Sequence, residues 1–76
     1  MRAQTDNEGQ TYFEVENLRI TIKPQVWGDG PPGLSFRAHK ENGGLYQGPE
    51  VPIESEAAAL DLLEAIVQAV RILFPQ

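Results

Sequence analysis

The chain contains no cysteine and only one histidine, His39. The absence of cysteine excludes disulfides and thiolate metal sites, and a lone imidazole leaves a transition metal without a second nitrogen or sulfur ligand. As a general base, His39 would need a nucleophile and an orienting acid, but Ser35 lies four residues away along a flat stretch of strand. We therefore expect no metal, no cofactor and no enzymatic activity.

Long apolar runs are also absent, since none approaches the roughly 18 residues that a membrane-spanning helix needs. Residues 1–10 are polar and lack the apolar segment of a signal peptide, so we expect a disordered or frayed tail there and a single domain over residues 11–76. These features predict a cytoplasmic protein without a membrane partner. A chain of 76 residues can build only a marginal core, which favours association with a second copy.

Positive charge is scarce, because six Lys and Arg residues stand against eleven Asp and Glu residues and leave a net charge of −5. That sum argues against nucleic acid and anionic membranes as partners. The distribution is uneven, however. Four cations balance four acids between residues 11 and 49, and the excess of acids lies in the two ends of the chain. The segment from 11 to 49 is therefore neutral rather than acidic.

Three segments, 12–16, 18–23 and 34–40, alternate apolar and polar residues, as half-buried β-strands do. A two-residue turn at Glu16-Asn17 would place the apolar residues of the first two segments on one face. A bulge at Asn17 within one bent strand is the alternative. Either way, the sequence predicts a sheet with one apolar face.

A second hairpin is indicated by Asn42-Gly43, the strongest turn signal in the chain. It predicts a fourth strand beginning at residues 45–47. Proline cannot donate to a strand ladder, so Pro49 and Pro52 should limit this strand to an edge position or break it in two.

A helix is predicted from Ser55, a plausible N-cap, to Phe74, with Pro75 closing it. Its apolar residues cover roughly half of the circumference, which is more than a small sheet requires. Either the arc is a wide core face under a wrapped sheet, or one flank packs on a second copy. The polar stripe consists of Asp61, Glu64, Gln68 and Arg71, and the expected dimer interface consists of Leu62, Ile66, Ala69, Val70 and Leu73.

Together these elements predict an α+β protein with an antiparallel sheet of about four strands in ββββα order, backed by one C-terminal helix and forming a homodimer. If the apolar residues face the helix, alternation places the cations and hydroxyls of the two central strands on the opposite face. Tyr12 joins this face, and a two-residue turn at Asn42-Gly43 would pair His39 with Tyr46 and add a second ring. The cations are Arg19, Lys23 and Arg37.

Cations beside aromatic rings are the composition of a surface that binds single strands, because bases stack on the rings while cations follow the phosphates. We expect Arg19, Lys23 and Arg37 to contact phosphates and Tyr12, Tyr46 and Trp27 to contact bases. Two alternatives stand beside this interpretation. Glu14 lies opposite Arg19 across the first hairpin, where charge pairs ordinarily stabilise sheets, and Trp27 can cover the edge of the core instead.

Five motifs follow one another in a characteristic order: Leu34-Ser35-Phe36-Arg37, Asn42-Gly43-Gly44, Gly48-Pro49, Val51-Pro52-Ile53 and the helix from Ser55 to Phe74. This order resembles the single-stranded-DNA-binding domain of the transcriptional positive cofactor four type, over about two-thirds of the chain. The resemblance implies a homodimer whose curved sheets bind single-stranded DNA in transcription and whose helices lie in the dimer core. One motif departs, since Pro49-Glu50 stand where the family carries consecutive lysines.

The function expected from the sequence is therefore non-catalytic binding of single-stranded DNA or RNA. The alternative is a homodimeric protein-interaction module that does not bind nucleic acid.

Overall fold

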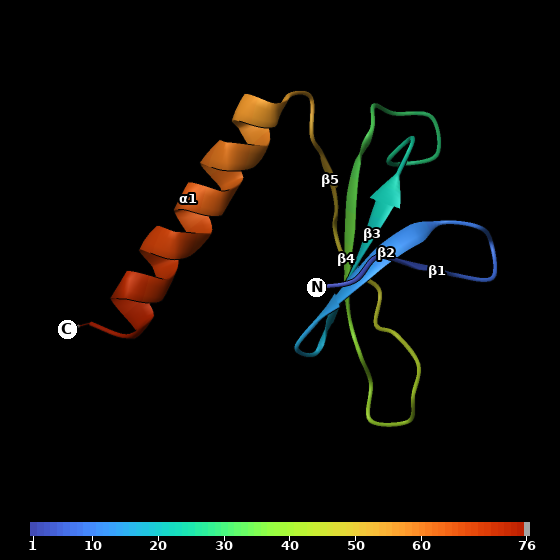
Figure 1. Ribbon diagram of the computed structural model, residues 1–76, viewed down its shortest axis with the longest axis horizontal. Helices are drawn as coiled ribbons and strands as arrows, with labels where there is room; N and C mark the ends of the chain where they lie inside the picture. Colours follow the sequence, from blue (N-terminus) through green and yellow to red (C-terminus); the bar gives the residue numbers. More distant parts are fainter. Residues whose placement is uncertain (76) are drawn as a thin grey trace.

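A computed structural model describes residues 1–75 as one antiparallel sheet followed by one helix (Figure 1). The five strands are neighbours in sequence order, so the sheet is a simple meander. This confirms the α+β class, with five strands where about four were expected. The elements are β1 (Gln4–Thr5), β2 (Thr11–Val15), β3 (Leu18–Lys23), β4 (Gly33–Ala38), β5 (Glu50–Pro52) and α1 (Glu56–Leu73).

The additional strand, β1, lies within the segment expected to be a frayed tail. It pairs with β2 through Gln4 opposite Tyr12 and Thr5 opposite Thr11. The hairpin between β2 and β3 has the predicted two-residue turn, since Val15 pairs with Leu18. Glu16 takes a positive φ of 54° in this turn, the backbone twist that tight hairpins favour.

The registers produce two chemically distinct faces, as the alternation predicts. Phe13 pairs with Ile20, which pairs with Phe36 on the next strand. In the same way, Glu14 pairs with Arg19, which pairs with Arg37. We call the first side the apolar face, with Phe13, Val15, Leu18, Ile20, Ile22, Leu34, Phe36, Ala38 and Val51. We call the other side the polar face, with Tyr12, Glu14, Arg19, Thr21, Lys23, Ser35, Arg37 and Glu50.

The edge beside β4 is interrupted, as expected from its two prolines. One isolated bridge joins His39 to Leu45, and pairing resumes only at β5. Between them Gly48 approaches β4 so closely that a Cβ there would lie 1.7 Å from the Phe36 carbonyl oxygen. The bridge also corrects the expected register: the second hairpin has a longer loop than Asn42-Gly43, so Leu45 rather than Tyr46 lies opposite His39.

Helix α1 begins where the sequence predicts. The Ser55 Oγ accepts a hydrogen bond of 3.0 Å from the Ala58 backbone N–H, and Glu56 lies in the first turn and Arg71 in the last. Both charges complement the helix dipole. No helix among residues 1–75 is long and apolar enough to cross a membrane.

The helix does not back its own sheet, which differs from the expected arrangement. No residue of α1 contacts any of the five strands, and none of its residues is buried. In Figure 1 the helix stands apart from the sheet, joined to it only through the segment after β5. The radius of gyration is accordingly 13.8 Å, against about 11.4 Å for a compact chain of this length.

Burial inside one chain is consequently slight. Within residues 1–75, Val26 is the one hydrophobic residue that is fully buried. It lies in the loop between β3 and β4, where its N–H donates to the Pro31 carbonyl and its own carbonyl accepts from Gly30. The apolar face is only half-buried, and Ile22, near the end of β3, is 44 % exposed.

Candidate nucleic-acid interface

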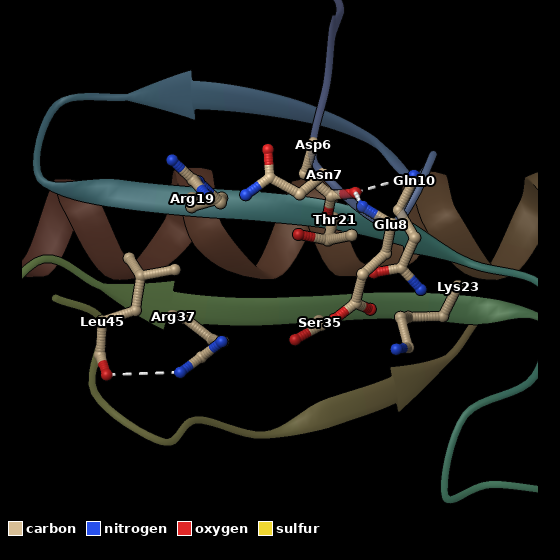
Figure 2. A pocket seen from close by; sticks show the side chains of 10 residues that line it. All are labelled: Asp6, Asn7, Glu8, Gln10, Arg19, Thr21, Lys23, Ser35, Arg37 and Leu45. Atoms are coloured by element: carbon tan, nitrogen blue, oxygen red, sulfur yellow. Dashed lines mark hydrogen bonds between the residues drawn. The ribbon is translucent and has the colours of Figure 1, made fainter.

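The polar face carries a hollow of about 280 Å³, walled by β3, β4 and the loop between β1 and β2 (Figure 2). Its floor contains the two buried polar residues, Thr21 and Ser35, which are 7 % and 8 % exposed. The three predicted cations Arg19, Lys23 and Arg37 surround this floor. The structure therefore brings together the residues that the sequence assigned to phosphate contacts.

Arg19 is held in place on two sides. Its Nε donates to the Glu14 Oε1 over 2.8 Å, and its guanidinium lies 4.1 Å from the centre of the Tyr12 ring. The Tyr12 hydroxyl in turn donates to Gln4 Oε1 over 3.3 Å. The expected cross-strand charge pair thus forms and neutralises Arg19. The Arg19 guanidinium also occupies one face of the Tyr12 ring.

Glu14 also contacts His39, whose Nε2 lies 2.6 Å from Glu14 Oε2. Burial opposes the charge on Glu14, but hydrogen bonds from His39 and Arg19, together with the charge of each, hold its pKa below the ordinary value. Glu14 is therefore a carboxylate that organises the β2 end of the polar face. Its partners leave it little capacity to act as a general base.

Arg37 and Lys23 keep their positive charge without a carboxylate partner. The Arg37 Nε donates to the Tyr46 carbonyl over 2.8 Å and its Nη2 donates to the Leu45 carbonyl over 3.2 Å. These bonds fix the guanidinium at the edge of the hollow (Figure 2). Among residues 1–75, neither Arg37 nor Lys23 forms an ion pair, so both are suited to an external anion.

A second hollow adjoins the first and shares Lys23, Ser35 and Arg37 with it. Trp27 lies on its wall, 62 % exposed, in a backbone conformation with a φ of 56°. The Trp27 backbone N–H donates to Glu50 Oε1 over 2.9 Å. A non-glycine residue with positive φ is uncommon and costs free energy. Here that conformation presents a large ring to solvent rather than covering the core edge.

Tyr46, by contrast, lies outside these two hollows. The register places it away from the polar face, and its ring lies 5.3 Å from the Lys40 Nζ in a separate hollow with Asn17 and His39. The expectation that Tyr46 and the cations share one surface is therefore wrong. The cause is the five-residue connection between His39 and Leu45, which shifts the strand by one residue.

The loop between β1 and β2 was missed in the sequence. Asp6, Asn7, Glu8 and Gln10 lie over the polar face and line the hollow. The Asp6 Oδ1 accepts from the Glu8 and Gln10 backbone N–H groups over 2.9 and 2.8 Å, while Gly9 takes a φ of 81°. Asp-Asn-Glu-Gly is turn chemistry, and it was a signal that could have revealed this hairpin.

The five predicted interface residues all lie on α1. Ile66, Ala69, Val70 and Leu73 are exposed and Leu62 is half-buried. Among residues 1–75 no group of three or more His, Cys, Asp or Glu residues could hold a metal ion. Comparisons with protein-family models, with curated proteins and with solved structures found no match to the chain.

Proposed function

We propose that this protein binds single-stranded nucleic acid on the polar face of its sheet, without catalysis. The observation that carries the proposal is the connection of the two hollows. Lys23, Ser35 and Arg37 belong to both, so a continuous surface runs from the three cations to the exposed ring of Trp27. A strand on this surface would meet charge and a stacking platform together.

The roles differ among the predicted residues. Lys23 and Arg37 are the phosphate contacts, because neither is paired with a carboxylate. Trp27 is the stacking platform, where one base contributes about 1–3 kcal/mol. Arg19 lines the hollow, and Tyr12 stacks on it from outside the hollow. Both contact the strand only at the edge of the surface, since each is already engaged with the other.

The resemblance to the positive cofactor four type supports this proposal, since that family binds single-stranded DNA with a sheet face. It extends the proposal to a role in transcription and to a homodimer. The cytoplasmic location is proposed separately, from the polar start of the chain. The exposed apolar side of α1 supports the homodimer independently. Each large apolar side chain taken from water into an interface contributes about 1.5–3 kcal/mol, and α1 has seven that are exposed.

A second candidate is a homodimeric protein-interaction module without nucleic acid. The observation that favours it is the number of carboxylates near the cations. Asp6 and Glu8 line the first hollow, and Glu50 lies on the second. Together with Glu14 they lower the positive potential that an anionic strand requires. The two candidates therefore differ in one measurable property, the affinity for oligonucleotides.

Titration of fluorescent oligo-dT at low and moderate salt separates the candidates. The proposal predicts binding that weakens with salt, with a slope of log K against log[salt] of about −0.7 per phosphate neutralised. Arg37→Ala should reduce the slope by about 0.7 and the affinity about tenfold. Arg71→Ala, on the polar stripe of the helix, is the matched control and should change neither quantity. Absence of binding at low salt by a dimeric protein would leave the second candidate.

A further inference from the structure

The chain has two apolar surfaces that do not cover each other. One is the apolar face of the sheet, whose Ile22 is 44 % exposed. The other is the helix, where Leu63, Val67 and Val70 are all exposed. No residue of α1 contacts a strand. Exposed apolar patches of this extent mark an interaction site in a soluble protein.

The amount of excess surface is what one interface requires. A compact folded chain of 8.4 kDa exposes about 4,600 Å², whereas this chain exposes 6030 Å². The excess is about 1,400 Å², and a stable interface buries about 800 Å² on each partner. The exposed surface is therefore large enough for an obligate association.

The connection between β5 and α1 is short, and a hydrogen bond lies at each of its ends. It is three residues long, from Ile53 to Ser55. The Ile53 N–H donates to the Pro32 carbonyl over 3.0 Å, which fixes one end. The Ser55 cap fixes the other. The connection carries α1 away from its own sheet, as Figure 1 shows.

We propose that two copies exchange helices, so that α1 of each lies against the apolar face of the other copy's sheet. This arrangement deepens the homodimer of the proposed function by specifying which surfaces meet. One self-complementary contact then covers both apolar surfaces of both chains, as two-fold symmetry requires. The polar face is the opposite side of the sheet, so the exchange leaves it open.

The dimensions of the two surfaces agree. The 18 residues of α1 form a helix about 27 Å long, and the six-residue β3 and β4 extend about 20 Å. The helix can therefore cross the whole apolar face. Its stripe of Asp61, Glu64, Gln68 and Arg71 stays in water on the outer side. A single chain type supplies both halves of this contact, so the occupant is a second copy.

Light scattering on the unmodified protein tests the dimer first. The expected mass is twice 8.4 kDa across the accessible concentrations. A mass equal to one chain would overturn both the homodimer and the exchange. No oligonucleotide is present in this measurement, so its failure is distinct from a failure of nucleic-acid binding.

Cross-linking then tests the exchange itself. The chain has no cysteine, so Val67→Cys and Ile22→Cys each introduce one thiol at a position that already tolerates exposure. The two variants, carrying tags of different size, are mixed, equilibrated and treated with a short flexible bis-maleimide. The proposal predicts a cross-linked product containing one chain of each kind. Glu64→Cys replaces Val67→Cys in the matched control, where the thiol points to water and little product should form.

Two other outcomes contradict the proposal. A product between two Val67→Cys chains, with none between Val67→Cys and Ile22→Cys, indicates that helices pair only with helices. A double variant that forms an internal link instead of linking two chains indicates that the helix closes on its own sheet.

Discussion

In a soluble single chain the apolar face of a sheet is expected to be buried and the polar face exposed. The two faces of this sheet show the reverse. The polar face contains the two most buried polar residues, Thr21 and Ser35, beneath a loop and long side chains. The apolar face is open to solvent within one chain, with Ile22 exposed near the end of β3. The comparison indicates that one surface is already complete in a single chain, while the other requires a second copy.

A charge on the open apolar surface should have the largest effect. Val70→Asp places a carboxylate on the apolar side of α1, where burial against a partner requires its desolvation. We expect the association constant to fall by at least 100-fold, or about 3 kcal/mol, measured by sedimentation equilibrium. Gln68→Asp introduces the same charge on the polar stripe two residues away and should leave the dimer intact. Equal effects from the two variants would contradict a one-sided interface.

Removal of the exposed ring should have the next largest effect, on the complete polar surface. Trp27→Ala deletes the stacking platform, and we expect oligo-dT affinity to fall by about 1–3 kcal/mol with an unchanged salt slope. Tyr46→Ala is the matched control, because Tyr46 is exposed but lies in a separate hollow. Anisotropy titrations measure both. A larger loss for Tyr46→Ala would mean that the strand follows the other edge of the sheet.

The loop over the polar face should weaken binding of anions, because Glu8 brings a carboxylate into the hollow with Lys23 and Arg37. Glu8→Gln keeps the size of the side chain and removes its charge. We expect a gain of about 1 kcal/mol in oligo-dT affinity at low salt, from a charge a few ångströms from a phosphate, and a smaller gain as salt rises. Glu41→Gln makes the same charge change outside this hollow and should have little effect.

The smallest predicted effect concerns pH. His39 and Arg19 hold the pKa of Glu14 below 4.5 in the folded protein, so the stability that this carboxylate contributes is present above about pH 4.5 and is lost as pH falls through the lower folded value. Glu14→Gln should therefore reduce stability at neutral pH by up to about 1 kcal/mol and flatten its decline in acid. Urea unfolding across this range measures the difference, and Glu16→Gln in the exposed turn is the control.

Much of the sheet could be predicted because strand alternation is local. The positions of Arg19 and Arg37 on one face and of Ile20 and Phe36 on the other follow from a period of two, and the turn at Glu16-Asn17 follows from the parity of the apolar residues. The failure at Tyr46 has an equally simple cause. The expected turn had two residues, and the observed connection has five. Because these lengths differ by an odd number, the Tyr46 ring lies on the other face.

Other features of the candidate site depend on residues far apart in the sequence. The contact from Trp27 to Glu50 spans 23 positions, and that from Glu14 to His39 spans 25. The identities of these four residues do not by themselves indicate which distant residue each one contacts. The cover formed by the β1–β2 loop likewise depends on where the hairpin folds over the sheet, which its turn residues do not specify.

The sequence alone determined the α+β class, the three strands β2, β3 and β4, the two chemically distinct faces and the capped C-terminal helix, because each follows from local periodicity and backbone preference. Only the tertiary structure decided that the helix stands apart from its own sheet, since the direction of the three-residue connection between β5 and α1 follows from no local periodicity. It also decided that Lys23 and Arg37 form no ion pair among residues 1–75, because that depends on where distant carboxylates lie.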